Sequence, residues 1–544
     1  MRFLKFLTLA ILSLMAFSLM AGVNLKNGNF YISYTDIVVP GGGPSLEITR
    51  TYNSKSTVDG WFGFGWGSDY ETFLQVSGDS SVTIFENGSG AHTRFSPKGE
   101  VNVQEAAQNI VDAMRKKDEM TDSAAKDLVK KLVGDAELRH AYAARFDVKS
   151  NIADGSVLYS NARGIQELHK LKDGFKRVFS DNREEYFNLA GKLTKIVDKN
   201  GYEVILNYNK NGVLESIKDS MAKQLFFSWF PDGKVKNIWS SDDKKAVYKY
   251  KDKDLIESTD VSGNTYAFHY DENHNLNKVG YSDGSEMAIV YEPKTQFVSS
   301  VTNKDKETIK YTYGGDAKNP DLHYWTEVTQ NDLAGKPVTN RYEYEIRTRP
   351  DGTEYNYRIL TIVNGLKTET IYTECCSLPL KIARGDEVTN FEYNGKGLLV
   401  KKTSTSGEFV NIEYHPELNK ITKVVNKDGW TQYKYDKAGN LLKANNNAGQ
   451  TVALIYDRKG RITKMVDQKG NEADQRILSF KYNALGKPVE IEMEKVGKIN
   501  VAYDNYGEIK KVESKTGHKM AMQVTEAFQN LLEIVKPAGV DLSL

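Results

Sequence analysis

The sequence predicts a mainly β protein in which antiparallel β-hairpins of about 21 residues follow one another and build a closed or spiralling wall. The first observation behind this prediction is that aromatic residues recur with a period of about 21 over most of the chain. The second is the composition, because 43 Gly, 31 Tyr and only 12 Pro are typical of many short strands joined by glycine turns. The third is that only two segments change to a helical pattern.

The aromatic period divides into two series. The first has steps of 20 to 22 residues and consists of Phe187, Tyr208, Trp229, Tyr250, Tyr270, Tyr291 and Tyr313. The second has steps of 21 residues, apart from one of 26, and consists of Tyr372, Tyr393, Tyr414, Tyr435, Tyr456, Tyr482 and Tyr503. Self-similarity at a fixed period is the signature of a repeat protein.

One period predicts one β-hairpin. In "YDKAGNLLKANNNAGQTVALI", Asp436 to Gly439 form a turn, because the Asp side chain bonds its own backbone and Gly adopts positive φ. Residues 441–444 and 451–456 read as strands on either side of a second turn. A lone hairpin is barely stable in water, so successive hairpins must pair with one another. These structural roles are assigned to Tyr208, Tyr250, Tyr270, Tyr393, Tyr414, Tyr435, Asp436, Gly439, Tyr456, Asp457, Gly460, Tyr482, Gly486, Tyr503, Asp504 and Gly507.

The N-terminus predicts export. Arg2 and Lys5 precede an apolar run over residues 6–20, and Ala21 suits cleavage of a secretory signal peptide at residues 1–21. An uncleaved membrane anchor is the alternative. No later apolar run is long enough to span a bilayer. We therefore expect a protein of the periplasm, the cell surface or the medium. The net charge of +1 gives no reason to expect a nucleic-acid partner.

The remaining segments complete the expected organisation. Residues 22–180 form an N-terminal β domain that contains a helical insert at about 103–145, where apolar residues fall at helical spacing. Residues 181–514 hold the repeats. Residues 515–544 form a helical tail, which Pro537 ends. That helix either caps the repeat wall or docks a partner.

The motif Y-D-x-x-G-x-L at this period resembles the YD repeat of Rhs proteins, teneurins and the shell subunits of insecticidal toxin complexes. The segment "NGNFYISYTDIVVPGGGPSLEITRTYNS" with "GWFGFGWGSDYE" resembles the N-terminal domain of bacterial Rhs proteins. The resemblance covers roughly residues 22–95 and 156–514. It implies a ribbon of strands that spirals into a hollow β-shell, which in polymorphic toxins holds a C-terminal toxin enzyme. Here no "DPxG" junction follows Tyr503, and only about 30 residues follow Ser514, too few for an enzyme domain.

The chain has two cysteines, Cys375 and Cys376, which are adjacent. Neighbouring Cα atoms lie about 3.8 Å apart, shorter than the usual span of a disulfide. We expect two structural thiols, with a vicinal disulfide as the alternative. No neighbouring His or Cys completes a set of metal ligands.

The sequence shows no HExxH, GxSxG, P-loop or CxxC motif, and it predicts no enzyme activity, no catalytic residue, no metal and no cofactor. The periodic aspartates are explained as turn residues. Trp61, Trp66 and Trp325 are candidate binding residues, since tryptophans also stack on sugars, although strand tryptophans more often pack in a core.

We therefore expect a non-enzymatic exported shell that binds, encapsulates or adheres to an unknown protein or glycan partner. Two alternatives stay open. The shell carries a separately encoded effector toxin, or it is an envelope polysaccharide hydrolase with carboxylates inside.

Overall fold

The computed structural model describes residues 21–39, 45–88, 90–97, 102–117, 119–160, 166–179, 181–198, 201–240, 245–332, 334–350, 352–374, 377–470, 475–483, 486–503 and 509–535. Of the signal peptide expected at residues 1–21, residues 1–20 lie outside these ranges, as do the two cysteines, Asp504, Gly507 and Pro537. Among the helices in these ranges, none is both long and apolar enough to cross a membrane.

The N-terminal part contains short strands and the helical insert. The strands are β1 (Ala21–Asn24), β2 (Asn29–Val39), β3 (Leu46–Asn53), β4 (Asp59–Gly60), β5 (Gly63–Phe64), β6 (Trp66–Ser68), β7 (Phe73–Val76), β8 (Val82–Glu86) and β9 (Ala91–Pro97), with a single 3₁₀ turn η2 (Asp69–Glu71). The insert consists of α2 (Val103–Arg115), α3 (Asp122–Gly134) and α4 (Ala136–Arg145). The helices predicted near 103–145 are therefore confirmed.

The remaining strands form the wall. They are β10 (Val157–Ser160), β11 (Gln166–Leu171), β12 (Gly174–Val178), β13 (Glu184–Asn188), β14 (Leu193–Val197), β15 (Glu203–Tyr208), β16 (Leu214–Asp219), β17 (Gln224–Trp229), β18 (Val235–Ser240), β19 (Lys245–Lys251), β20 (Asp254–Thr259), β21 (Thr265–Tyr270), β22 (Leu276–Tyr281), β23 (Glu286–Tyr291), β24 (Val298–Thr302), β25 (Thr308–Gly315), β26 (His323–Asn331), β27 (Pro337–Thr348), β28 (Glu354–Val363), β29 (Leu366–Tyr372), β30 (Pro379–Arg384), β31 (Glu387–Tyr393), β32 (Leu399–Ser404), β33 (Phe409–Tyr414), β34 (Ile421–Asn426), β35 (Gly429–Tyr435), β36 (Leu441–Asn446), β37 (Gln450–Tyr456), β38 (Ile462–Lys469), β39 (Arg476–Tyr482), β40 (Pro488–Met493), β41 (Gly497–Tyr503) and β42 (Ile509–Ser514). Helix α5 (Gly517–Val535) follows them.

Every strand from β7 to β42 pairs antiparallel with the next one, so one ribbon of hairpins runs through the chain. The helical insert separates β9 from β10 in the sequence, but these two strands pair with each other, so the ribbon is continuous. It also continues past residue 180, where the sequence places a domain boundary, because β12 pairs with β13. The mainly β, hairpin-repeat fold expected from the sequence is therefore confirmed.

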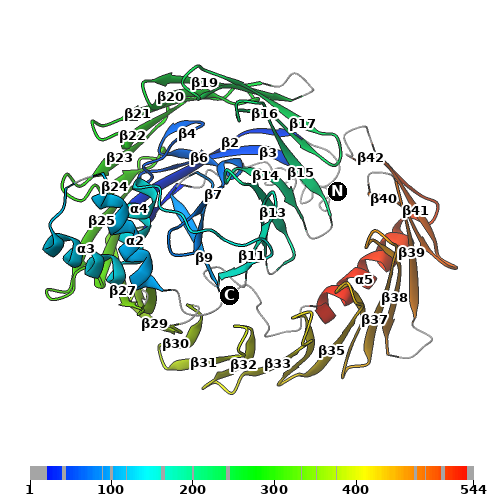
Figure 1. Cartoon of the computed structure of the whole chain (residues 1–544). Helices are drawn as coiled ribbons and strands as arrows, with labels where there is room; N and C mark the ends of the chain where they lie inside the picture. Colours follow the sequence, from blue (N-terminus) through cyan, green and yellow to red (C-terminus); the bar gives the residue numbers. More distant parts are fainter. Residues whose placement is uncertain are drawn as a thin grey trace.

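The ribbon coils because a register shift immediately precedes the aromatic residue at every position of the two aromatic series except Tyr313. For example, the pairing shifts between Lys434 and Tyr435 and again between Ile455 and Tyr456. Such β-bulges bend a strand and increase its twist, and their regular spacing accumulates into curvature. The result is an open, shell-like spiral (Figure 1). Its inner circuit closes where β7 reaches the start of β14, through the pair Phe73 and Lys192 and a 2.8 Å hydrogen bond from Leu74 N to Gly191 O.

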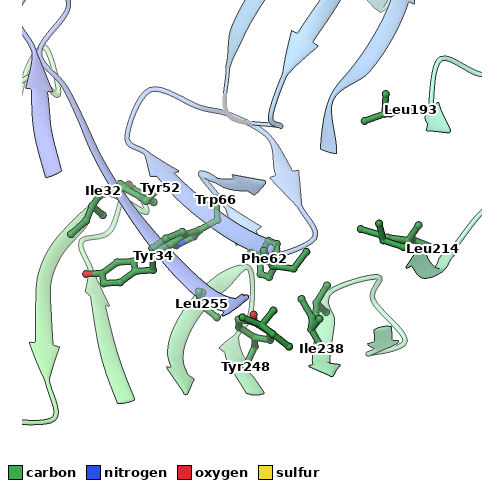
Figure 2. Close-up of a cluster of buried hydrophobic side chains, with 14 of the residues drawn as sticks. Ile32, Tyr34, Tyr52, Phe62, Trp66, Leu193, Leu214, Ile238, Tyr248 and Leu255 are labelled. Atoms are coloured by element: carbon green, nitrogen blue, oxygen red, sulfur yellow. The ribbon is translucent and has the colours of Figure 1, made fainter. Parts of the chain in front are cut away.

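The small sheet β1-β2-β3-β6 fills the inner side of the first wall strands (Figure 1). Its apolar residues join those of β10 to β25 in one buried cluster, part of which Figure 2 shows. A second cluster lies between α5 and strands β33 to β41, and a third holds the three helices of the insert together. The N-terminal sheet and α5 therefore cover two different parts of the inner face.

Candidate binding surfaces on the inner side of the wall

The repeat aromatics join neighbouring hairpins. Ten of these tyrosines donate their hydroxyl to a backbone carbonyl 14, 15 or 20 residues earlier, at 2.6–3.0 Å. Tyr435, for example, donates to Ile421 O at 2.8 Å. At Trp229 the indole N–H makes the same type of bond, to Leu214 O at 2.7 Å. The same type of hydrogen bond therefore recurs about every 21 residues, and each copy joins one hairpin to the preceding one.

The aspartates and glycines of the motif form the turns. Oδ1 of Asp436 accepts hydrogen bonds from Ala438 N and Asn440 N, both at 2.9 Å, and Gly439 has φ of 85°. The hydrogen bond from the Asn440 side chain is the main cause that lowers the pKa of the Asp436 carboxyl. Asp457 accepts the equivalent backbone bonds from Lys459 and Arg461. These carboxylates accept hydrogen bonds from the backbone of their own turns, so they are poorly placed to act as acids or bases.

The N-terminal part, through its strands and the turns between them, attaches to the wall at residues that begin wall strands. Val235 N donates to Trp61 O at 2.8 Å, and Val298 N donates to Gly28 O at 2.9 Å. Between them, Leu276 N donates to the Tyr52 hydroxyl at 3.0 Å. Tyr250 also contributes to this attachment. Its hydroxyl donates to Trp61 O at 3.4 Å, whereas the tyrosines of other repeats donate to a carbonyl of the wall.

A buried ion pair lies at the centre of this attachment. Arg50 Nε donates to Asp36 Oδ2 at 2.7 Å, and both side chains are almost completely buried. The guanidinium lies within 5.0 Å of the ring centres of Tyr34, Trp66 and Phe268. The wall supplies further partners, since Tyr248 donates to Asp36 at 2.9 Å and Arg50 donates to Ser258 Oγ at 2.5 Å.

The three tryptophans proposed as binding residues differ in accessibility. Trp66 is fully buried and donates to the Tyr270 hydroxyl, so it offers no surface to a ligand. Trp325 in β26 is half-buried, and the guanidinium of Arg341 stacks 4.3 Å from its ring centre. Trp61, also half-buried, lines a pocket of about 430 Å³ between the N-terminal part and the first repeats.

Glu71 anchors the hairpin that carries Trp61. Its Oε1 accepts from Trp61 N at 2.6 Å, and its Oε2 accepts from Ser68 Oγ at 3.2 Å. Burial raises the pKa of the Glu71 carboxyl to about 8. Both oxygens hold the hairpin in place, so we assign Glu71 a structural role rather than that of a catalytic acid.

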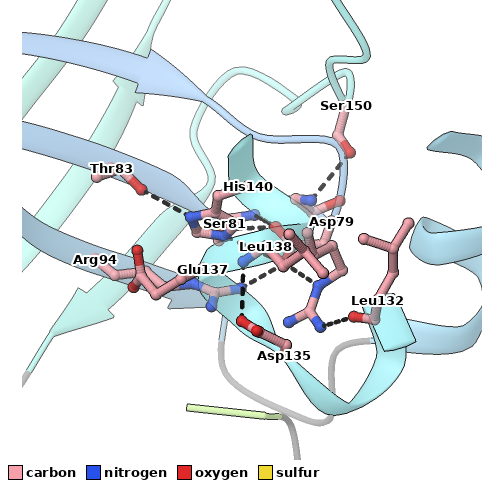
Figure 3. Close-up of polar contacts among 12 residues, drawn as sticks. Asp79, Ser81, Thr83, Arg94, Leu132, Asp135, Glu137, Leu138, His140 and Ser150 are labelled. Carbon is pink, nitrogen blue, oxygen red and sulfur yellow. Dashed lines mark hydrogen bonds and ion pairs between the residues drawn. The ribbon is translucent and has the colours of Figure 1, made fainter. Parts of the chain in front are cut away.

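A second polar cluster, which local sequence motifs do not reveal, surrounds Asp79 (Figure 3). Asp79 Oδ2 faces Arg139, Arg94 and His140, and Ser81 Oγ donates to Asp79 Oδ1 at 2.5 Å. Burial alone raises the pKa of Asp79, but the His140 ring and the Arg94 guanidinium outweigh it and hold that pKa well below its usual range.

Ser81, His140 and Asp79 are the residue types of a hydrolase triad, but their arrangement is different. Ser81 is fully buried, and both Ser81 Oγ and Asp79 Oδ2 approach the same ring nitrogen, Nε2 of His140, at 3.3 and 3.6 Å, whereas in a triad the serine and the aspartate contact opposite nitrogens. Arg139 also donates to Leu132 O at 2.7 Å. The cluster therefore fixes α4 to the turn before β8. The partners of His140, Ser81 and Thr83, lie 59 and 57 residues earlier in the chain, so no local motif joins them.

Helix α5 lies on the concave side of strands β36 to β42 (Figure 1). Met520, Ala527 and Ile534 face the wall and are buried, and Tyr433 donates to Ile534 O at 2.8 Å. Asn530 donates to Asp467 Oδ1 at 2.8 Å, and Arg476 pairs with Glu526 at 2.5 Å.

The two flanks of α5 differ in chemistry. One flank borders a polar groove of about 710 Å³, which includes Arg476, Lys495 and Glu533. The other flank, which we call the apolar flank, consists of Phe528, Leu532 and Val535 at positions i, i+4 and i+7, and these side chains are 36, 58 and 38% exposed. A helix that only capped the wall would not need this second apolar surface.

Two family models match this chain, one in the N-terminal part and one in the repeat wall. Residues 21–95 match the domain of unknown function DUF6531, and residues 251–286 and 435–472 match the RHS Repeat. The tRNA3(Ser)-specific nuclease WapA of Bacillus spizizenii and the tRNA nuclease WapA of Bacillus subtilis are each 23% identical over 301 residues. That alignment covers 54% of this chain and 10% of each relative, so the matched region spans about a tenth of their length.

Two solved structures are also similar. The crystal structure of TcdB2-TccC3-TEV gives a TM-score of 0.37 at 10% identity, covering 93% of this chain and 31% of that one. The structure of the Photorhabdus luminescens Tc holotoxin pore gives a TM-score of 0.36 at 9% identity, and the alignment covers 89% of this chain and 29% of that one. The chain thus carries a match to DUF6531 followed by two matches to the RHS Repeat, which agrees with the resemblance to Rhs proteins noted in the sequence.

Proposed function

We propose that this protein is an exported, non-enzymatic shell that holds a polypeptide partner against its concave wall. The observation that carries the proposal is the apolar flank of α5, which is exposed on the inner side of a coiled wall. Exposed apolar surface of this kind is typical of an interaction site. The polar groove on the other flank adds hydrogen-bonding groups that suit a peptide backbone.

A separately encoded effector is the form of partner that this surface fits best. The apolar flank and the polar groove lie on one helix, so an extended polypeptide laid across α5 meets both. The curated relatives are named as tRNA nucleases, but the matched region covers only a tenth of each of them. We therefore do not extend nuclease activity to this chain.

The hydrolase alternative has weaker support. It requires two facing carboxyl groups with different pKa values. Glu71 has the raised pKa that such an acid needs, but its two oxygens bond to Trp61 N and Ser68 Oγ. The aspartates of the repeat turns are likewise bonded to their own backbone.

Site-specific crosslinking tests the proposed function. The photoreactive residue p-benzoylphenylalanine replaces Leu532 on the apolar flank, and in a control it replaces Ile455, which is 52% exposed on the outer face of β37. We expect the protein recovered from its own secreting cells to yield one crosslinked polypeptide of defined mass from position 532 and none from 455.

The partner is identified by mass spectrometry and must then bind the purified shell when it is added separately. Replacing Leu532 with Gln should weaken that binding at least fivefold without changing the unfolding midpoint, because exposed substitutions rarely alter stability by more than about 0.5 kcal/mol. Equal crosslinking from both positions, or none from 532, contradicts the proposal.

A further inference from the structure

One repeat carries a larger aromatic residue than the fold needs. At ten other positions a tyrosine hydroxyl reaches the carbonyl of a preceding hairpin, and Trp229 makes the equivalent bond with its indole N–H. A tyrosine at position 229 would satisfy the same carbonyl. The indole stacks on Phe227, with ring centres 6.0 Å apart, and its larger ring system extends beyond what the bond to Leu214 O requires.

That ring lines the 430 Å³ pocket that also contains Trp61. The two indoles meet edge to face, with ring centres 5.6 Å apart and planes at 83°. Tyr208 and Phe73 add further aromatic surface. The volume is within the range of about 300–1,000 Å³ that small-molecule sites occupy, and such sites are mostly apolar with a few placed polar groups.

The Trp61 side of the pocket is held rigidly before any ligand binds. Trp61 N donates to Glu71, and Trp61 O accepts from Val235 N, so the backbone of this residue is fixed on both sides. Its neighbour Phe62 is completely buried and packs edge to face on Tyr248 at 5.2 Å. Preorganisation of this kind lowers the entropic cost of binding.

The charges at the rim balance one another. Lys234 Nζ lies 3.5 Å from Asp59 and 3.3 Å from Asp232, and Lys192 Nζ donates to Gly212 O at 2.6 Å. The ammonium group of Lys234 therefore faces two carboxylates, while that of Lys192 is bonded to a backbone carbonyl. Because Asp59, Asp232 and Lys234 already neutralise one another, the rim offers no strong field of one sign, and it suits a neutral ligand with many hydrogen-bonding groups.

We propose that the Trp61–Trp229 pocket binds a neutral pyranose unit of a glycan. The C–H face of a pyranose stacks on an indole, and its hydroxyl groups can both donate to Asp59 or Asp232 and accept from lysine. This site lies at the opposite end of the chain from α5 and is independent of the polypeptide partner proposed above.

The test uses saturation-transfer NMR and tryptophan fluorescence with four neutral disaccharides: maltose, lactose, cellobiose and N,N′-diacetylchitobiose. We expect at least one to bind. Trp229→Tyr should weaken that binding at least fivefold while the unfolding midpoint stays unchanged, because tyrosine keeps the bond to Leu214 O. The matched control is Trp239→Tyr, since Trp239 stacks on Phe226 on the other face of the same hairpin and its replacement should leave binding unaltered.

If Trp229→Tyr does not fold, Asp232→Asn serves instead, because this exposed carboxylate lies at the rim and its amide still accepts a bond from Lys234 N. It should also weaken binding. Failure of all four disaccharides to bind overturns the proposal, as does equal binding by wild type and Trp229→Tyr, or preferential binding of tetramethylammonium. Disaccharide binding that depends on Trp229, together with no crosslink from position 532, would support the glycan site and contradict the proposed polypeptide partner.

Discussion

Replacing Arg50 with methionine is expected to lower the free energy of unfolding by about 3–5 kcal/mol, because the substitution leaves Asp36 as an unpaired buried charge. The loss should be smaller at pH 5 than at pH 8. Without the guanidinium the pKa of Asp36 rises further, and protonation at lower pH then removes the buried charge. Urea unfolding followed by tryptophan fluorescence measures the change, since Trp66 packs on Arg50.

The double variant Asp36→Asn/Arg50→Met provides the control. It removes both charges, and replacement of a whole buried ion pair is often neutral. The amide oxygen introduced at position 36 can still accept the hydrogen bond that Tyr248 donates in the wild type. We expect the double variant to recover at least half of the lost stability. If the single and double variants are equally unstable, the ion pair does not hold the N-terminal sheet to the wall in the way described.

Replacing Glu71 with glutamine should remove a large pH dependence of stability. The pKa of Glu71 is raised from 4.5 to about 8 in the folded protein, so folding favours the protonated form. The associated stability is therefore fully present below about pH 4.5 and is lost as the pH rises through about 8. Between pH 6 and pH 9 the wild type should lose about 2–3 kcal/mol from this group.

The Glu71→Gln variant keeps an acceptor for Trp61 N but carries no proton to release, so its stability should change much less over the same interval. Glu215→Gln, at an exposed position in β16, is the matched control and should retain the pH dependence of the wild type. Thermal unfolding midpoints at pH 6 and pH 9 make the comparison. A decline of equal size in wild type and Glu71→Gln would show that Glu71 is ionised in the folded state.

Local spacing was sufficient to predict the wall. Strands β36 and β37 lie where the "YDKAGNLLKA" period predicts them, because a turn chemistry set by Asp436 and Gly439 needs no information from elsewhere in the chain. The bond from Tyr435 to Ile421 was not predicted, although the constant spacing of the aromatics is its signature.

The attachment of the N-terminal sheet was missed for a different reason. Asp36 and Arg50 sit at the inward positions of β2 and β3, in line with Tyr34 and Tyr52, so the alternation marks both as buried. Their pairing with each other, and with Ser258 more than 200 residues away, follows only from the coiling of the wall. The Asp79 cluster likewise joins a turn and a helix whose contact depends on tertiary packing.

The binding surfaces required the three-dimensional arrangement as well. Trp61 and Trp66 lie in the same short segment, and the sequence does not distinguish them. In the structure Trp61 lines a pocket, whereas Trp66 is fully buried. The sequence predicts a helical tail at residues 515–544, but not which of its faces meets the wall. The structure shows that Met520, Ala527 and Ile534 are buried and that Leu532 and Val535 are exposed, while Phe528 is partly exposed and meets Phe480 of the wall edge to face.

We propose that the tyrosines and aspartates of the period build the wall, while binding belongs to the residues that depart from it. The most direct test is the crosslinking yield from position 532 in a Tyr435→Phe/Asp436→Ala background, which removes the hydroxyl and the turn carboxylate but keeps the aromatic ring. We predict a lower unfolding midpoint and a crosslinking yield within twofold of the parent at a temperature where both are folded. Loss of the crosslink in a folded variant would contradict the account, because it would place function in the repeat motif itself.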